Sequence, residues 1–318
     1  MNIPFVKMHG LGNDYLFIDA RRSESLDPFA AAPVVCDRRR GVGADGIVMY
    51  GTPRDPANDA WMTVVNADGS DGGVCGNGLR CLAVLLTEGR DVGGQEIRVE
   101  TPGGVVGLRV EGATDEGRVI VEAEMGPPVL KLVDIPASIP GSDPEATWID
   151  RAIGEIAGFD PSAWGLPMEA RLSLVSMGNP HLVILLPRGG SREMIDRSIR
   201  RIGPGLERHP WFPERINVHL MVIDSPGRIR LATWERGSGP TRACGTGACA
   251  AAVATRLSGP GPEWQGVELP GGRLEVGWTG SLEDPVRQRG PAEEILRDVL
   301  DGSMGLEPEA DSGEDGVR

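Results

Sequence analysis

Several features that mark common classes of protein are absent from this sequence. No run approaches the roughly 20 consecutive apolar residues needed to span a bilayer. Residues 1–7 lack the basic and apolar regions of a signal peptide. We therefore expect a cytoplasmic protein that does not associate with membranes.

Residues that hold metals and cofactors are scarce as well. The chain has only four histidines and no Cys-x-x-Cys pair, so no metal-ligating cluster is expected. Lysines are few, and Lys7 and Lys131 stand in strand-like or proline-rich segments without a recognisable pyridoxal setting. Five cysteines, an odd number without framework spacing, favour a reducing compartment over a disulfide scaffold. The sequence thus favours chemistry that uses neither metal nor cofactor.

Positive charge is also in short supply. The net charge of −14 argues against a nucleic-acid partner, because phosphate binding needs clustered Lys and Arg. The local exception, Arg38 to Arg40, is expected to be a solvated turn beside two glycines. With 40% apolar and 25% charged residues, the 318-residue chain has the composition of a soluble globular protein of one or two domains.

Short apolar runs typical of β-strands recur along the chain, and 46 glycines and 26 prolines predict many tight turns between them. Antiparallel sheet is expected over residues 95–124. Other strands are expected at residues 5–8, 15–19, 46–50, 61–65, 172–176, 181–185, 217–222 and 229–234. A short helix is expected at residues 293–300, and disorder in the acidic segment 305–318. A proline-rich, aperiodic stretch places a domain boundary near residue 126.

Two segments share one pattern: a strand, a polar loop, Cys-Gly-x-Gly and an apolar helix. The first runs from Asn66 through Cys75-Gly76-Asn77-Gly78 into residues 79–86. The second contains Cys244-Gly245-Thr246-Gly247 and enters residues 248–254, which carry no charge on any face and predict a buried central helix. A duplicated domain with its active site between the copies explains this pattern.

A cysteine at the start of a helix is placed where its thiol can be reactive. The thiolate is the reactive form of Cys, and the unpaired N–H groups and the dipole of a helix N-terminus stabilise an anion. Flanking glycines let the backbone approach a ligand, and the same N–H groups can bind a carboxylate. One such cysteine could be a nucleophile, a base or a core residue. Two matching ones indicate that a thiolate removes a proton from one face while a thiol gives one to the other, which suits inversion at a carbon beside a carboxylate.

An ordered set of motifs resembles the diaminopimelate epimerase family, whose members convert LL-diaminopimelate to the meso form for lysine and cell-wall synthesis. The matching segments are residues 7–15, 66–70, 75–81, 176–181, 214–218, 235–237, 243–249, 269–272 and 290–294. The resemblance implies an α/β (α+β) fold of two pseudo-symmetric domains, each a mostly antiparallel or mixed sheet wrapped around a central helix. The first domain would comprise residues 1–126, completed by about 284–300, and the second residues 127–283.

The resemblance also implies the site residues. Cys75 and Cys244 would be the acid–base pair of a cofactor-independent reaction on diaminopimelate, in a protein that forms a homodimer. The residues implied to hold the reacting carboxylate are Gly76, Asn77, Gly245 and Thr246. Those implied to read the polar ends of the substrate are Asn13, Asn66, Asn179, Asn217 and Arg236, with Glu235 beside the reacting amino group and His181 in support.

Other interpretations remain open. Another two-Cys racemase, of the proline or hydroxyproline type, would share the Cys-Gly-Thr-Gly device, but the asparagine set and Glu235-Arg236 favour a substrate with a second amino-acid end. A non-catalytic relative would not need both thiols. A redox sensor that joins Cys75 to Cys244 is compatible with an enzyme.

Two features depart from the family pattern. His219 stands where relatives commonly carry an acidic residue, and residues 71–74 form an unusual approach to Cys75. Both bear on substrate preference. The remaining cysteines, Cys36, Cys81 and Cys249, are expected to be small buried hydrophobes.

Overall fold

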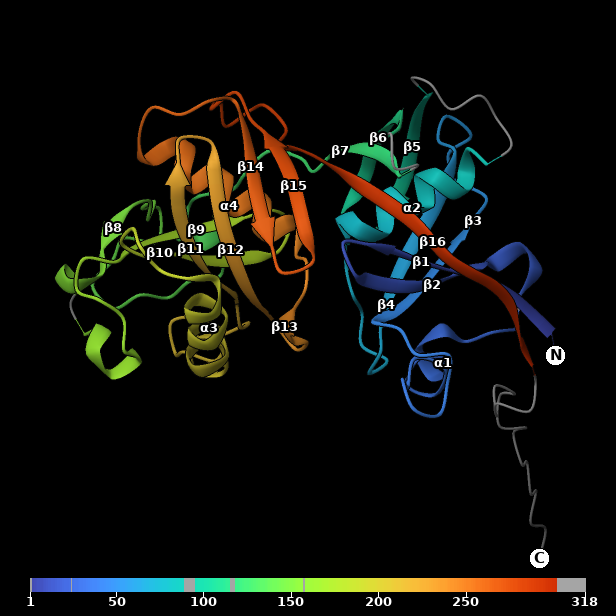
Figure 1. The fold of residues 1–318 in the computed structure, drawn as a ribbon, viewed down its shortest axis with the longest axis horizontal. Helices are drawn as coiled ribbons and strands as arrows, with labels where there is room; N and C mark the ends of the chain where they lie inside the picture. Colours follow the sequence, from blue (N-terminus) through green and yellow to red (C-terminus); the bar gives the residue numbers. More distant parts are fainter. Residues whose placement is uncertain (1, 24, 89–94, 115–117, 157, 302–318) are drawn as a thin grey trace, which may run out of the picture.

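One continuous β-sheet runs through both halves of the molecule (Figure 1). The structure, a computed structural model, describes residues 2–23, 25–88, 95–114, 118–156 and 158–301. The acidic tail at 305–318, for which disorder is expected, lies outside the described residues. Within them, no helix is both long and apolar enough to cross a membrane.

The first half of the sheet closes on itself around a helix. Its strands are β1 (Asn2–Gly10), β2 (Asn13–Asp19), β3 (Gly46–Gly51), β4 (Ala60–Asn66), β5 (Gln95–Thr101), β6 (Gly104–Ala113), β7 (Val119–Glu124) and β16 (Arg287–Asp301). They are neighbours in that order, and β16 pairs with both β7 and β1, which completes a barrel. Helix α2 (Gly76–Leu86) packs against β1, β6, β7 and β16 and is therefore the core of this half.

The second half wraps its strands around another helix. These strands are β8 (Arg151–Ala152), β9 (Arg171–Ser176), β10 (Pro180–Leu185), β11 (Asn217–Ser225), β12 (Arg228–Glu235), β13 (Gly239–Thr241), β14 (Trp264–Leu269) and β15 (Gly272–Gly277). The order from β16 is β15, β14, β12, β11, β10, β9 and β8, with β13 paired to β12. Helix α4 (Gly245–Ser258) lies against six of these strands, and its residues 245–254 are all buried, as the uncharged sequence predicts.

The two halves repeat one another strand by strand. From β1 to β7 the successive pairings are antiparallel, parallel, antiparallel, parallel, antiparallel and antiparallel. The series from β9 to β16, with β14 following β12, has the same order. Helices α1 (Pro28–Val35) and α3 (Arg192–Glu207) occupy equivalent connections, and so do α2 and α4. The expected fold class is confirmed, and short 3-10 turns complete it at Ala20–Arg22, Leu132–Asp134, Ile153–Glu155 and Pro161–Trp164.

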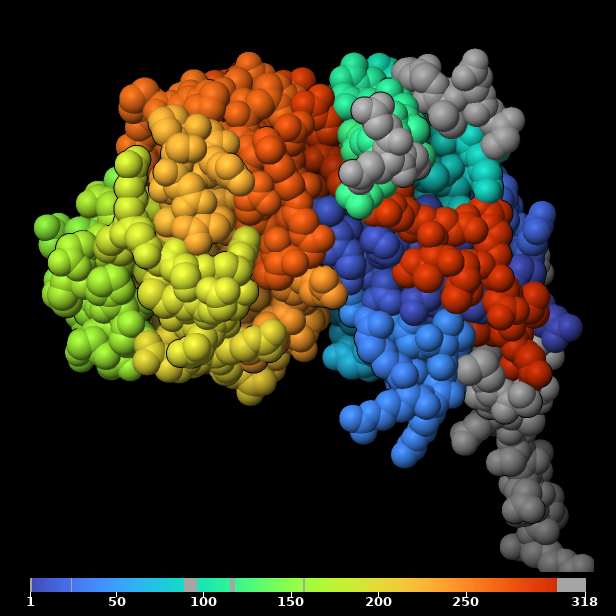
Figure 2. All heavy atoms as spheres, viewed as in Figure 1, coloured from blue at the N-terminus to red at the C-terminus, as the bar shows by residue number. Residues whose placement is uncertain are grey.

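The helix expected at residues 293–300 is wrong, because this segment is the second part of β16. Residues 287–292 pair with β7 and residues 293–301 pair with β1. These two neighbours supply inter-strand partners for the backbone, and this outweighs the local helical pattern. In Figure 2 the red atoms of this end of the chain lie on the surface of the first half, beside the blue atoms of the N-terminal segment.

Helix α3 was not predicted from the sequence. Its apolar residues Ile195, Ile199, Ile202 and Leu206 are buried at helical spacing, but Gly203, Pro204 and Gly205 interrupt the pattern. One hydrophobic cluster includes both Leu82 of α2 and Val253 of α4, so the central helices of the two halves share a core. This shared core brings the starts of both helices to one place.

Candidate active site

A cavity of about 750 Å³ lies at the starts of α2 and α4 and holds both cysteines of the duplicated motif. Ten of the thirteen site residues expected from the sequence line it: Asn13, Asn66, Cys75, Gly76, Asn77, Asn179, Glu235, Cys244, Gly245 and Thr246. The other three, His181, Asn217 and Arg236, do not line the cavity in this structure. Residues from both halves of the fold therefore share one site.

Each cysteine is the residue immediately before its helix, in an extended backbone conformation. Cys75 has φ −115° and ψ 110°, and Cys244 has φ −112° and ψ 107°. The thiol of Cys75 accepts a hydrogen bond from the N–H of Gly78 at 3.4 Å, as a side chain at a helix N-cap can do. Because the backbones match, the two thiols stand in equivalent positions on two helices.

A single buried side chain, Gln288 of β16, separates the two helix starts. A Cβ atom added to Gly76 would lie 1.9 Å from its Nε2, and one added to Gly245 would lie 2.6 Å from its Oε1. Neither approach can be relieved cheaply, because Gln288 is fully buried and hydrogen-bonded. The glycine after each cysteine therefore allows both helix N-termini to reach the same point.

A buried arginine holds the polar groups around Gln288. The Arg80 guanidinium is fully buried and donates to Gln288 Oε1 at 3.0 Å and to Asn77 Oδ1 at 2.5 Å. This fixes the Asn77 amide, whose Nδ2 donates to Asn13 Oδ1 at 2.8 Å and to the carbonyl of Ala243 at 3.0 Å. Arg80 is thereby linked to the residue that precedes Cys244 in the other half.

The two thiols have different surroundings. Burial raises the pKa of Cys75 above its usual value, although hydrogen bonds with the Tyr15 hydroxyl and the Gly78 N–H partly oppose this. Burial and the nearby Glu235 carboxylate hold the pKa of Cys244 well above its usual range. The nearest hydroxyl to Cys244 is Thr246 Oγ1, at 3.6 Å. Cys75 is thus the thiol that ionises more readily.

Glu235 is itself a weakened acid. Burial raises the pKa of its carboxyl group, although hydrogen bonds from Thr241 and Cys244 partly oppose this. The Thr241 hydroxyl donates to Glu235 Oε1. A partly buried carboxylate in this position can accept a further hydrogen bond from an ammonium group.

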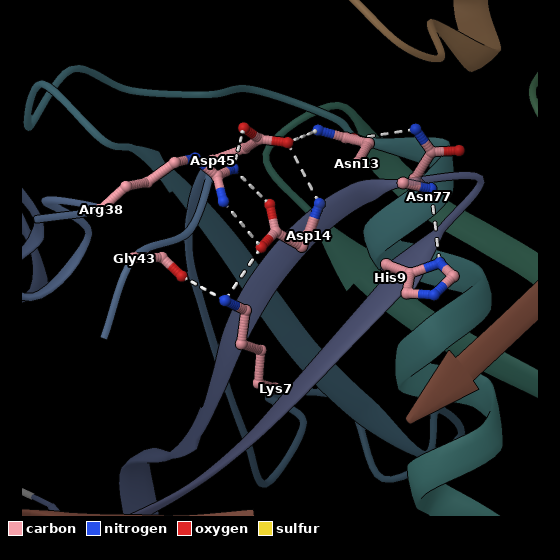
Figure 3. Close-up of polar contacts among 9 residues, drawn as sticks. Lys7, His9, Asn13, Asp14, Arg38, Gly43, Asp45 and Asn77 are labelled. Carbon is pink, nitrogen blue, oxygen red and sulfur yellow. Dashed lines mark hydrogen bonds and ion pairs between the residues drawn. The ribbon is translucent and has the colours of Figure 1, made fainter. Parts of the chain in front are cut away.

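A charged network supports Asn13, a buried residue that lines the cavity (Figure 3). Asn13 Nδ2 donates to Asp45 Oδ2 at 2.8 Å, which leaves its Oδ1 to accept from Asn77. Arg38 bridges Asp45 and Asp14 at 2.7 and 2.6 Å. Arg38 to Arg40 form a turn, as predicted, but the Arg38 side chain pairs with these carboxylates although it is 55% exposed.

In the second half, a chain of buried polar groups leads to Asn179. His181 Nε2 lies 2.7 Å from Asn179 Oδ1, and His181 Nδ1 lies 2.9 Å from His219 Nε2. His219 Nδ1 is 3.0 Å from the Thr233 hydroxyl. Burial lowers the pKa of both imidazoles, that of His219 to about 3, so both are neutral. With Asn179 Oδ1 facing His181, the contacts are satisfied when Thr233 donates to His219, His219 to His181, and His181 to Asn179. The Asn179 amide then turns its N–H₂ group away from His181.

Asn217 and Arg236 lie behind the cavity wall. The buried Asn217 side chain donates to the carbonyl of Pro180 at 2.9 Å and accepts from the Arg236 backbone N–H at 2.9 Å. The Arg236 side chain donates to the carbonyl of Glu214 at 3.0 Å. Asn217 thus supports the backbone that follows Glu235, while Asn66, on the cavity wall, donates to Ser70 Oγ at 3.0 Å.

Sequence reasoning missed four residues of the site: Tyr15, Asp45, Arg80 and Gln288. Tyr15 and Arg80 stand within or beside recognised motifs, so their position was a usable signal. Nothing in the local sequence marks Asp45 or Gln288. The pairing of β16 with β7 brings Gln288 to the site, and Asp45 precedes β3, where its backbone N–H donates to the carbonyl of Asp14. In the described part of the chain, no cluster of three or more His, Cys, Asp or Glu could hold a metal ion.

Comparisons with known proteins agree with this geometry. The sequence profile of the diaminopimelate epimerase family matches residues 5–131 and 173–294. A diaminopimelate epimerase of Thioalkalivibrio sulfidiphilus is 40% identical over 303 residues, which cover 95% of this chain and 100% of the relative.

Two solved structures share the fold at low sequence identity. One is a predicted epimerase from Pseudomonas aeruginosa, with a TM-score of 0.64 and 17% identity over 94% of this chain and 99% of that one. The other is a probable proline racemase from Agrobacterium radiobacter, with a TM-score of 0.63 and 17% identity over 94% and 93%. At this identity the structures establish the fold alone, whereas the family profile and the full-length relative establish the family. The chain belongs to the diaminopimelate epimerase family.

Proposed function

We propose that this chain converts LL-2,6-diaminopimelate to meso-diaminopimelate without a cofactor, with Cys75 and Cys244 as the acid–base pair. The observation that carries the proposal is that two thiols, each immediately before a central helix, line one cavity between the halves of the fold. The names of the full-length relatives support the choice of substrate.

The reaction needs one proton removed and one returned. The thiolate of one cysteine takes the proton from the α-carbon, so that a Cα–H bond breaks and an S–H bond forms. The thiol of the other cysteine then donates its proton to the opposite face of the carbanion, which inverts the centre. Since the reaction is reversible, each cysteine is the base in one direction and the acid in the other.

The carbanion is stabilised through the carboxylate beside it. The N–H groups at the starts of α2 and α4, at Gly76, Asn77, Gly245 and Thr246, lack intrahelical partners and provide fixed donors for that carboxylate. Glu235 would accept from the amino group of the reacting centre. Asn13, Asn66, Asn179, Asn217 and Arg236 would select the other polar ends, with His181 in support.

The organisation and setting of the enzyme follow from the same proposal. The first domain comprises residues 1–126 and the return segment 284–300, an assignment supported by the pairing of β16 with β1 and β7, and the second comprises residues 127–283. The enzyme acts in the cytoplasm, in lysine and peptidoglycan precursor synthesis. It forms a homodimer, for which the exposed apolar side chains Ile295, Leu296 and Val299 of β16 offer a contact surface.

The test is incubation of the purified protein with LL-diaminopimelate in deuterated water without added cofactor, followed by NMR and chiral analysis. Conversion to the meso form, with deuterium at the inverted α-carbon, is the expected result. Exchange with proline or hydroxyproline instead would keep the two-thiol chemistry and refute the substrate. No exchange with either kind of substrate would refute the proposed function.

A further inference from the structure

We infer that Tyr15 is a catalytic residue: its hydroxyl donates a hydrogen bond to the thiolate form of Cys75 and makes Cys75 the more readily ionised of the two thiols. The catalytic role given to Tyr15 rests on the proposed function. Its geometry and its main test concern only the two side chains.

Tyr15 is placed firmly against Cys75. It is the third residue of β2, directly opposite Gly46 of β3, and its ring lies over that glycine, where a Cβ atom would be 3.1 Å from the Tyr15 Cε1 atom. The residue is 6% exposed and lines the cavity. Its Oη lies 3.3 Å from Cys75 Sγ; while the thiol is protonated, the Cys75 S–H donates to Oη, and the hydroxyl can donate in return once the thiol is ionised.

The direction of this hydrogen bond follows from the chemistry of the two groups. Burial and the nearby Cys75 and Glu235 hold the pKa of Tyr15 well above its usual range, so the phenol stays protonated. A thiolate has no proton and can only accept, and a hydrogen bond to an ionised group is roughly twice as strong as a neutral one. When Cys75 takes a proton from the substrate, its S–H becomes a donor and the phenol oxygen can accept it. No proton leaves the pair.

Among the described residues of the second half, no hydroxyl stands at the position equivalent to Tyr15, although the Thr246 hydroxyl lies near Cys244 and partly lowers the pKa of that thiol. The register of β10 with β11 places His181 opposite Asn217, as β2 with β3 places Tyr15 opposite Gly46. His181, however, contacts Asn179 and His219 rather than Cys244. The groups that face Cys244 are Thr246 and the carboxyl of Glu235, and a carboxylate opposes a second negative charge. The pseudo-symmetry of the thiols is therefore broken by their neighbours.

The test measures how fast each thiol is alkylated by iodoacetamide as a function of pH, read for each cysteine-containing peptide by mass spectrometry. Tyr15→Phe removes one oxygen atom and keeps the ring. It should move the midpoint of Cys75 alkylation upward by about one pH unit, which is a roughly tenfold lower rate at a fixed pH below the midpoint. Tyr50→Phe is the matched control, because Tyr50 is the only other tyrosine and does not line the cavity. It should leave the midpoint in place.

A second measurement works in the opposite direction. In the Tyr50→Phe protein, biosynthetic replacement of tyrosine by 3-fluorotyrosine alters Tyr15 alone and makes its phenol a stronger donor. The Cys75 midpoint should then move downward. This measurement tests the role of Tyr15 even if the Tyr15→Phe variant does not fold.

The outcomes separate this inference from the proposed function. A Cys75 midpoint that is unchanged by Tyr15→Phe or by fluorination overturns the role of Tyr15, whether or not the protein epimerises diaminopimelate. Opposite shifts in a protein that does not act on diaminopimelate would support the hydrogen bond and refute the substrate. In an active enzyme, the acidic limb of kcat/KM should follow the alkylation midpoint.

Discussion

His219 Nε2 lies 2.9 Å from His181 Nδ1, and both imidazoles are completely buried. Two charged imidazolium groups could not share this position, and neutral rings satisfy every polar contact from Thr233 to Asn179. His219 is also packed against the start of α4, since a Cβ atom on Gly247 would lie 2.2 Å from its Cε1. His219 therefore connects the helix of Cys244 to a residue on the cavity wall.

His219→Gln should make the protein less sensitive to acid. In the folded protein the His219 pKa is about 3, below the ordinary value of 6.5, so the unfolded chain binds the proton more readily. The stability that His219 contributes is thus fully present above pH 6.5 and is lost as the pH falls from 6.5 towards 3. At pH 5.5 this loss amounts to about 1.4 kcal/mol, and a glutamine does not incur it. Urea unfolding at pH 7.5 and 5.5 should show the gap between wild type and variant change by this amount.

Thr233→Val provides a control for the His219 experiment. It removes the hydroxyl that donates to His219 Nδ1 but no titrating group. It should destabilise the protein by about 1–2 kcal/mol at both pH values, because one buried acceptor loses its partner. Parallel loss of stability in wild type and His219→Gln between pH 7.5 and 5.5 would contradict a neutral His219.

Cys75→Ala and Cys244→Ala should each abolish epimerisation, with kcat lower by about 10²–10⁴-fold, because either direction requires both a base and an acid. The double variant should be little worse than either single one, since the two thiols act as a unit. Cys249→Ala is the control, because this thiol lies one turn further along α4 and burial raises its pKa to about 12. Near-normal turnover in either of the first two variants would exclude the two-thiol mechanism.

Arg80→Met should reduce catalysis more than stability. The substitution removes a buried cation, which an apolar side chain of similar length replaces at little net cost, but it leaves Asn77 Oδ1 and Gln288 Oε1 without a donor, at about 1–3 kcal/mol each. These effects oppose one another, so we expect a stability change below about 3 kcal/mol. The freed Asn77 amide should lower kcat by about 10–100-fold. Steady-state kinetics beside urea unfolding tests this, and a variant with wild-type kcat would show that Arg80 does not position Asn77.

The sequence predicts most strands and both central helices because their signals are local. Residues 248–254 carry no charge, and α4 is buried there. Alternating apolar runs such as residues 61–65 became strands for the same reason. The segment 293–300 shows the limit of this reasoning, because its structure depends on β1, almost 300 residues earlier in the chain.

The candidate site shows the same limit. The helix-start cysteines could be recognised from motifs, and ten of the expected residues line one cavity. The contacts that surround these cysteines could not be recognised from motifs. Gln288 reaches Gly76 and Gly245 only because the barrel closes, and Tyr15 reaches Cys75 from a neighbouring element. A motif indicates which residues are present, whereas the sheet register decides which atoms meet.

Arg236 offers a test of how the site recognises the far end of its substrate. Its side chain donates to the Glu214 carbonyl outside the cavity, while its backbone is held by Asn217. If Arg236 binds the distal carboxylate, as proposed, Arg236→Gln should raise KM for diaminopimelate by about tenfold or more, because a charged hydrogen bond is lost, and should change kcat much less. If Arg236 serves only to hold Glu214, Arg236→Gln should instead lower the free energy of unfolding and leave KM unchanged. Arg215→Gln is the matched control, because Arg215 directly follows Glu214 in the chain, pairs with Glu207 at 3.7 Å and does not line the cavity. A rise in KM for Arg236→Gln but not for Arg215→Gln would show that the guanidinium leaves Glu214 and reaches the substrate.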